Sequence, residues 1–415
     1  MKINKWTLGL AAVGLISLPA VVQADEKPSP IMTALASTTI SGYVNTSAQW
    51  DIGNGTQNAP GYAFNQASKQ DGFNLNAVKV TLEKPLDESE WAAGYKASFV
   101  YGPDANVLGT ASSGINTSDF AIKEAFVAVR APLGNGLDVK MGVFDTIIGY
   151  ETFDAGSNPN FSRSWGYTIE PTTHTGILAT YRFAEWLSVA MGVANTYGPT
   201  INGRATTLVT PPGTLTPTTD VAQTQKSYMA SIALTAPKDM GFLAGSTLYS
   251  GIIYGFNSST VYTSTGASFP GGNQTSLYVG STLNTPITNL KVGAAFDYVF
   301  GVGNGWGVPS SYAWAASLYA SFQATEKLSL HARGEYAAHD PTAGPWAFAS
   351  GFPPKVFSAT ATIQYDLWKN VLSRVEFRWD HSANGQPYFG GTAQGGSAPT
   401  SINAYTLMLN LIYNF

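Results

Sequence analysis

The chain contains no cysteine in its 415 residues. Disulfide bonds, thiolate metal sites, cysteine nucleophiles and lipid-modified cysteine anchors are therefore excluded. Charged side chains make up only 12% of the residues, about half their usual share in soluble proteins. Beyond the amino-terminal region, no apolar run is long enough to cross a membrane as a helix. These absences exclude a helical membrane protein and argue against an ordinary soluble enzyme.

Aromatic side chains and glycine, by contrast, are plentiful. Aromatic residues make up 13% of the chain, and there are 43 glycines. Low charge combined with this composition fits a membrane β-barrel better than a soluble enzyme, although a secreted all-β protein has a similar composition. The net charge of −4 gives no indication of a nucleic-acid partner.

The amino-terminal stretch Met1–Ala24 has the pattern of a secretory signal peptide. Lys2 and Lys5 precede a short apolar segment that Pro19 interrupts, and small residues stand at the cleavage position. A membrane anchor is the alternative, but the segment is short and ends in a helix breaker. We expect cleavage near Ala24, followed by a periplasmic linker at Asp25–Ser37.

The last stretch of the chain, Ser401–Phe415, alternates between two kinds of face. Every second residue from Tyr405 to Phe415 is apolar, with aromatic residues at both ends, while the other face is mixed and includes Asn410 and Asn414. A strand between lipid and a watery lumen has this pattern. The final Tyr-Asn-Phe resembles the terminal signal that the barrel-insertion machinery reads in outer-membrane proteins, which makes Phe415 the expected contact.

Similar alternating stretches recur from Thr39 onward, and the connections between them alternate in length. Long segments such as Ile52–Phe73 are rich in Gly, Ser, Thr, Asn and Pro, whereas short ones such as Pro132–Gly136 carry turn residues. Outer-membrane barrels have long outer loops and short periplasmic turns, and a soluble sandwich has no reason to keep this alternation. The sequence therefore predicts an all-β fold, a transmembrane antiparallel up-and-down β-barrel of about 16 strands at residues 38–415, in the outer membrane of a Gram-negative-type cell.

Charged residues of both signs fall on the strand faces expected to point inward. Charges on the lipid face cost about 2–4 kcal/mol near the membrane midplane, so these side chains are expected in the lumen. We interpret them as the lining of a water-filled pore, because a barrel of this size is too wide for its wall to fill. Paired ions that stabilise or plug the wall are the alternative. The expected pore-lining and constriction residues are Glu124, Arg130, Lys140, Glu151, Arg163, Arg333, Glu335, Arg374, Glu376 and Arg378.

The long connection Asp145–Thr172 is less polar than the others. It mixes large apolar side chains, such as Phe153 and Trp165, with charged ones, and an exposed loop rarely holds so many apolar groups. We expect it to fold into the barrel and narrow the pore, with Glu151 and Arg163 at the constriction. An outer lid or a contact between subunits is the alternative.

A catalytic or metal site finds little support in the sequence. The chain has four histidines, and the adjacent pairs His339-Asp340 and Asp380-His381 point to opposite sides of a strand. No Gly-x-Ser-x-Gly motif and no spaced cluster of metal ligands is present. We expect no enzymatic activity, no cofactor and no metal.

Four motifs in the first half of the chain carry a resemblance to a known family. They are FAIKEAFVAVRAPLGNGLDVKMGVF from Phe120, Ile148-Gly-Tyr-Glu151, NPNFSRS from Asn158 and PTTHTG ending at Gly176. With them, the chain resembles the putative β-barrel porin-2, or OmpL-like, family. The resemblance implies an outer-membrane channel for small solutes, and it gives neither a substrate nor catalytic residues.

The predicted function is an outer-membrane porin through which small hydrophilic solutes diffuse passively. A substrate-selective, sugar-type channel is the first alternative, with Tyr43, Tyr278 and Tyr312 as members of an aromatic track; a structural or adhesin barrel is the second. The expected partners are outer-membrane lipid, small hydrophilic solutes, the barrel-insertion machinery and further copies of the chain in a homotrimer.

Overall fold

The computed structural model describes residues 37–53, 55–111, 117–209, 218–257, 260–262, 267–269, 272–302, 311–340, 352–392 and 396–415. The expected signal peptide lies outside the described residues, as does the linker except for Ser37. Parts of several long loops are also outside this range.

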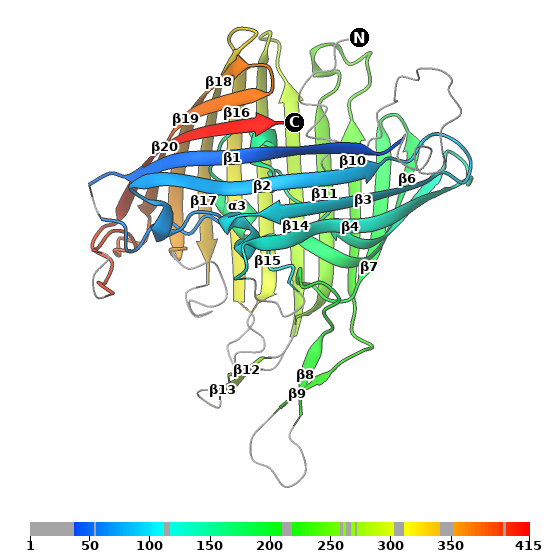
Figure 1. Ribbon diagram of the computed structural model, residues 1–415, viewed down its shortest axis with the longest axis horizontal. Helices are drawn as coiled ribbons and strands as arrows, with labels where there is room; N and C mark the ends of the chain where they lie inside the picture. The colour runs from blue at the N-terminus through cyan, green and yellow to red at the C-terminus, as the bar shows by residue number, and fades with distance from the viewer. Residues whose placement is uncertain are drawn as a thin grey trace.

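Sixteen antiparallel strands form one closed barrel, in which each strand pairs with its neighbours in the chain. In Figure 1 the short turns lie at the top, and the long loops lie at the opposite end. The strands are β1 (Thr39–Asp51), β2 (Gly72–Lys84), β3 (Ala93–Tyr101), β4 (Phe120–Ala131), β5 (Leu137–Asp145), β6 (Thr173–Ala184), β7 (Leu187–Ala194), β10 (Ser227–Thr235), β11 (Thr247–Asn257), β14 (Gly272–Asn284), β15 (Leu290–Val302), β16 (Ser311–Gln323), β17 (Leu328–His339), β18 (Lys355–Trp368), β19 (Val371–Ser382) and β20 (Asn403–Asn414).

The first and last strands close the barrel, as predicted. β1 pairs antiparallel with β20, and Ala48 lies opposite Leu409. Asn410 is buried on the inner side, where its amide donates to Asn45 Oδ1 (2.7 Å), whereas Leu409 and Leu411 are exposed on the outer side. Closure removes the open sheet edges that hydrocarbon does not tolerate.

The long loops contain short elements that the sequence analysis missed. Two hairpins, β8 (Thr206–Val209) with β9 (Thr218–Val221) and β12 (Thr260–Tyr262) with β13 (Ala267–Phe269), extend beyond the barrel at the long-loop end. The long loops also hold the helical turns η1 (Ala67–Lys69), η2 (Pro103–Val107), η3 (Ala155–Ser157) and α3 (Trp165–Ile169), whereas η4 (Gly241–Leu243) lies in the short turn between β10 and β11. None of the helices in the described ranges is long and apolar enough to span a membrane.

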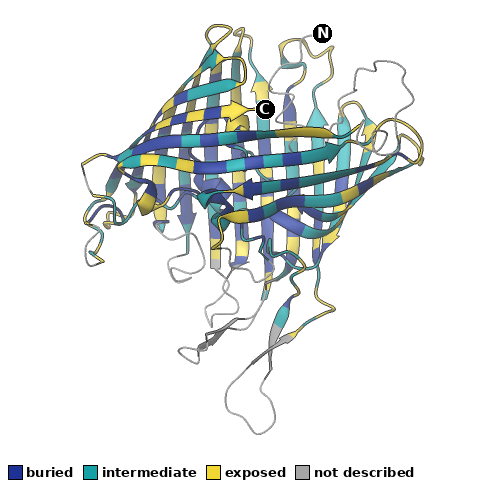
Figure 2. Ribbon diagram, in the orientation of Figure 1, coloured by how far each residue is buried: buried dark blue, intermediate teal, exposed yellow. Residues whose placement is uncertain are grey.

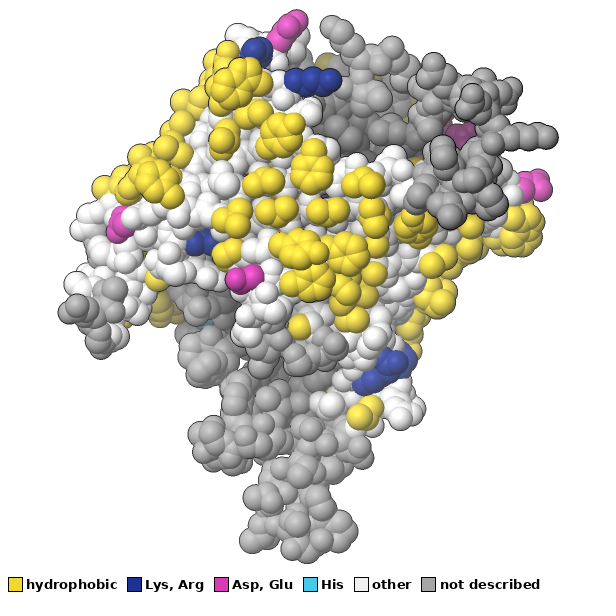
Figure 3. All heavy atoms as spheres, in the orientation of Figure 1, with side chains coloured by type: hydrophobic (Ala, Val, Ile, Leu, Met, Phe, Trp, Pro, Cys, Tyr) yellow, Lys and Arg dark blue, Asp and Glu magenta, His cyan; other side chains and the backbone are white. Residues whose placement is uncertain are grey.

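The strands have an apolar outer face and a polar inner face. In Figure 2 the ribbon colours alternate between more and less buried residues along the strands, and Figure 3 shows hydrophobic side chains gathered over the outer face of β1–β4. On β19, Val375 and Phe377 are exposed on the outer face, while Arg374, Glu376 and Arg378 are buried on the inner face. The alternation seen in the sequence is therefore the division between lipid and lumen.

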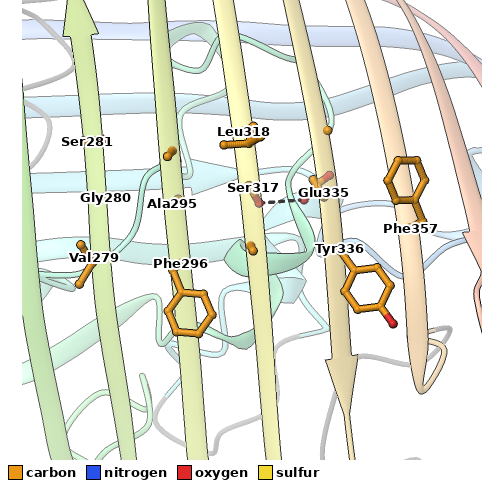
Figure 4. A pocket seen from close by; sticks show the side chains of 13 residues that line it. Val279, Gly280, Ser281, Ala295, Phe296, Ser317, Leu318, Glu335, Tyr336 and Phe357 are labelled. Atoms are coloured by element: carbon orange, nitrogen blue, oxygen red, sulfur yellow. Dashed lines mark hydrogen bonds between the residues drawn. The ribbon is translucent and has the colours of Figure 1, made fainter.

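A shallow groove of about 610 Å³ crosses the outer face over β14–β18. Small residues, among them Ala294, Ala316 and Gly334, leave space between the larger Phe296 and Leu318 (Figure 4). Because these residues lie on the apolar outer face, the groove belongs to the lipid-facing surface and not to the lumen.

Candidate functional site in the barrel interior

The segment between β5 and β6, residues 146–172, lies inside the barrel; we call it loop 3. Of its 27 residues, 16 are buried, including Phe153, Phe161 and Trp165, nine are partly exposed, and only Gly156 and Ser157 are exposed. Its first part reaches β14, where the Tyr150 hydroxyl lies 3.0 Å from Thr282 Oγ1. The apolar side chains that made this segment unusual are thus the ones that pack it against the wall.

Arg333 on β17 is the main cation that holds loop 3. Its Nη1 donates to Glu151 Oε1 (2.8 Å) and to the Ser162 carbonyl (2.8 Å), and its Nη2 donates to Ser162 Oγ (3.0 Å). Its Nε donates to Glu335 Oε2 on the same strand (2.8 Å). All three charged side chains have no exposed side-chain surface. A buried guanidinium with this many partners fixes the loop in one position.

Carboxylates on the wall accept backbone N–H groups of loop 3. Glu376 Oε1 accepts from Ser162 (2.8 Å), Glu335 Oε1 accepts from Trp165 (2.8 Å), and Glu376 also accepts from Phe161. From within the loop, Glu151 Oε2 accepts from Ser164 (2.7 Å). These bonds satisfy N–H groups that burial would otherwise leave without partners.

Arg374 and Arg378, both on β19, hold two further points of the loop. Arg374 donates to the carbonyls of Ala155 (2.8 Å) and Asn158 (2.7 Å). Arg378 binds both oxygens of Asp380 (2.8 and 2.9 Å) and also donates to the Arg163 carbonyl.

An aromatic cluster fills the interior on the β15–β20 side. The indole of Trp165 stacks on Phe352 with 4.8 Å between ring centroids and donates to Asp380 Oδ1 (2.9 Å). Tyr62, from the loop between β1 and β2, contacts Trp165 edge to face, and Phe389 from the last loop joins the cluster. Loops from four parts of the chain therefore meet at Trp165.

At the end of loop 3, the acidic side chain of Glu170 lies near that of Asp297 on β15. Ser164 caps the short helix α3 by accepting from the Tyr167 N–H (3.1 Å), and Glu170 follows the helix. Burial raises the pKa of the Glu170 carboxyl well above its ordinary value, and the charge of Asp297 on β15 raises this pKa further. Burial and the charge of Asp297 therefore favour the neutral form of the Glu170 carboxyl over the charged form.

A second charged cluster lies on the inner wall of β2–β5; we call it the lysine wall. It consists of Lys79, Lys96, Lys123 and Lys140, one from each strand. Three of them pair with carboxylates: Lys79 with Asp154 of loop 3 (2.6 Å), Lys96 with Glu124 (2.7 Å) and Lys123 with Asp145.

Water reaches the lysine wall more readily than the loop anchors. The side chains of Lys96, Asp145 and Asp154 are 15%, 23% and 21% exposed, whereas those of Arg333 and Arg378 have no exposed surface.

The sequence-predicted residues fall into three places. Glu151, Arg163, Arg333, Glu335, Arg374, Glu376 and Arg378 are buried between loop 3 and the wall, where water lining had been expected. Glu124 and Lys140 belong to the lysine-wall region, and Arg130 lies near a short turn, where it pairs with Asp138 (2.6 Å). The burial has a simple physical reason: loop 3 covers the charges that the bare wall would present to water.

Lys79, Lys123, Asp145 and Asp154 were not among the predicted site residues. The alternation of β2 indicates that Lys79 points inward, opposite Val78 and Val80, so this signal was available. Lys123 was harder to find, because a bulge in β4 skips it in the pairing with β3 and breaks the alternation. Of the aromatic track, Tyr312 is on the outer face, 41% exposed and stacked on Tyr298, so this part of the expectation was wrong.

The described part of the chain contains no group of three or more acidic or histidine side chains placed to hold a metal ion.

Comparisons with known proteins agree with this architecture. Residues 37–415 match the sequence model of the family described as putative beta-barrel porin-2, OmpL-like. No protein of curated function matches the chain.

Three similar solved structures are outer-membrane barrels. The outer-membrane channel DcaP of Acinetobacter baumannii has a TM-score of 0.58 at 12% identity, covering 91% of this chain and 97% of its own. An anion-selective porin from Comamonas acidovorans has a TM-score of 0.57 at 11% identity, with 91% and 99% covered. OmpT of Vibrio cholerae, in a trimer form, has a TM-score of 0.53 at 11% identity, with 91% and 99% covered. At these identities the likeness shows the fold alone.

Proposed function

We propose that small hydrophilic solutes cross this protein by passive diffusion. The proposal starts from the family: this chain belongs to the putative beta-barrel porin-2, OmpL-like family and is an outer-membrane channel. The family is one of non-enzymatic channels. The observation that carries the proposal is a closed barrel with a folded-in loop and a partly hydrated charged wall beside it.

The passage runs along the lysine wall. Support comes from exposure: the side chains of Lys96, Asp145 and Asp154 retain access to water, whereas the Arg333 and Glu335 side chains behind loop 3 have none. Loop 3 narrows the passage from the opposite side, and Arg333 with its partners acts as the anchor of this constriction. Glu124 and Lys140 line the passage, while Glu151 and Arg163 support it from behind.

The wall carries four lysines against the three carboxylates Glu124, Asp145 and Asp154, which leaves one excess positive charge. A local excess of one sign raises the concentration of the opposite ion in a narrow passage. We therefore expect the channel to pass anions in moderate preference to cations.

Purified protein in planar lipid bilayers tests this function. We expect steady, ohmic conductance in KCl and a reversal potential, under a salt gradient, on the anion-selective side. Lys96→Gln should move the reversal potential towards cation selectivity, because Glu124 then keeps its charge without its nearest partner. Arg130→Gln, which removes a cation at the rim, is the control and should have a smaller effect. A barrel without conductance would contradict the diffusion function and favour a structural or adhesin role.

The remaining assignments complete the proposal. Residues 1–24 are a signal peptide cleaved near Ala24, 25–37 a periplasmic linker, and 38–415 a single barrel domain, with Phe415 recognised by the insertion machinery. Assembly as a homotrimer is supported by the trimer form of the similar Vibrio barrel. A sugar-selective channel is less well supported, because Tyr312 faces outward and Tyr43 and Tyr278 are buried.

A further inference from the structure

Lys140 differs from the other three cations of the lysine wall. Among the described residues, Lys79, Lys96 and Lys123 each have a carboxylate within 4 Å, whereas the contacts recorded for Lys140 are with two aromatic rings. Its Nζ lies 5.1 Å from the centroid of Phe126 and 5.3 Å from that of Phe144. Both Lys140 and Phe126 are partly exposed.

The wall next to Phe126 has little side-chain bulk. The strand register places Lys96 opposite Phe126, Phe126 opposite Gly142, and Gly142 opposite Gly176. The adjacent glycines on β5 and β6 bring no side chain, and the backbone of the neighbouring strands packs closely against them. Along this row, a cation and an aromatic ring are therefore followed by a stretch of wall made of backbone alone.

Apolar and aromatic side chains extend this surface across the inner wall. Leu178 lies opposite Lys140 on β6, and Ile147, Tyr150 and Tyr249 are partly exposed members of the same apolar cluster. A simple inorganic anion has no apolar part to pack against such a surface, whereas a solute with a negative charge and an apolar body packs against it.

We propose a binding site on this inner wall for small organic anions that carry an apolar or aromatic body. The site consists of Lys140, Phe126 and the two glycines beside Phe126. The carboxylate of the solute meets the ammonium group of Lys140, with Lys96 in reach along the same row, and its apolar part lies against Phe126. Burial of the apolar part and a charge-assisted hydrogen bond both contribute to binding of the solute. A solute that makes only one of these interactions therefore binds weakly. This inference rests on the proposed diffusion function and names its preferred solute class.

The test uses benzoate as the probe, with acetate as a charge without a ring and benzyl alcohol as a ring without a charge. In bilayers, benzoate should block the KCl current at a concentration about tenfold below that needed for acetate or benzyl alcohol, a difference of about 1.4 kcal/mol. Lys140→Gln and Phe126→Ala should each raise the blocking concentration of benzoate about tenfold. Lys291→Gln, which removes an inward cation on β15, is the matched control and should leave the block unchanged.

Equal block by benzoate and acetate, or equal loss in the Lys140 and Lys291 variants, would overturn the proposal, because either result means that charge alone decides. Calorimetric titration of benzoate into the detergent-solubilised full chain tests the same site without conductance. Binding that Lys140→Gln abolishes supports the site even in a barrel that passes no current; absence of binding refutes it. A channel that conducts but neither binds nor is blocked by benzoate keeps the diffusion function and loses only this inference.

Discussion

Arg333→Met is expected to release loop 3 from the wall and to increase single-channel conductance. The substitution keeps most of the side-chain volume but leaves Glu151 buried without its cation and Glu335 with only Arg378, at 3.9 Å. Removing one partner of a buried ion pair costs about 3–5 kcal/mol, because the remaining charge is uncompensated. The hydrogen bonds between the strands do not depend on this ion pair. The barrel should therefore still fold, while loop 3 opens. Bilayer recordings should show larger and noisier currents, and protease digestion should cleave loop 3 faster than in the unaltered protein.

Two further variants separate the anchor from general effects of charge. Arg130→Met breaks a half-exposed pair with Asp138, and such pairs contribute about 0–1 kcal/mol, so conductance should stay near that of the unaltered protein. Adding Glu151→Gln and Glu335→Gln to Arg333→Met removes the stranded charges and should recover part of the lost stability. If Arg333→Met conducts like the unaltered protein and resists protease equally well, Arg333 does not anchor the loop.

Trp165→Ala should loosen the contact between loop 3 and the outer loops. The side chain is fully buried, stacks on Phe352 and donates to Asp380, so its removal leaves a cavity and takes one hydrogen bond from Asp380, which keeps its bonds to Arg378. Large-to-small substitutions of buried tryptophan cost about 3–5 kcal/mol. Because each 1.4 kcal/mol changes an equilibrium about tenfold, the population of opened loop should rise by more than about a hundredfold. Cleavage of loop 3 under native conditions, in the regime where its rate follows that population, measures the change.

Trp368→Ala is the matched control for this substitution. Trp368 is 71% exposed beside a short turn at the other end of the barrel, so its loss creates no cavity. In the Trp368→Ala variant, loop 3 should be cleaved at the same rate as in the unaltered protein. Equal rates in the Trp165 and Trp368 variants would mean that the aromatic cluster does not hold the loop.

The strands were largely predictable because lipid and lumen impose opposite demands on alternate residues. The expected number of about 16 strands and their up-and-down arrangement in a barrel agree with the structure, in which β1 pairs with β20. Outward placement of Tyr312 was also readable, since Tyr312, Trp314 and Leu318 share one face of β16. The short hairpins in the long loops were missed, because strands of three or four residues are too short to show an alternating pattern.

The arrangement of the interior was only partly predictable. Alternation assigns Arg333, Glu376 and Arg378 to the inner face, and the apolar content of loop 3 indicates that it packs inside. Alternation carries no information about which inner charges the loop covers, since that depends on long-range contacts such as Glu151 with Arg333. Seven of the ten charges expected in the pore lining are therefore buried with loop 3, while Glu124 and Lys140 lie on the partly hydrated wall of β2–β5 and Arg130 lies near a short turn.

We propose that loop 3 divides the interior into a buried anchor and a hydrated passage along the lysine wall. Because the chain contains no cysteine, single cysteines report on this division directly. In open channels, a charged thiol reagent should modify Lys96→Cys and reduce the current, whereas Ser317→Cys, on the wall behind loop 3 and 2% exposed, should stay unmodified. Rapid modification at Ser317→Cys with loss of current, and none at Lys96→Cys, would contradict the account.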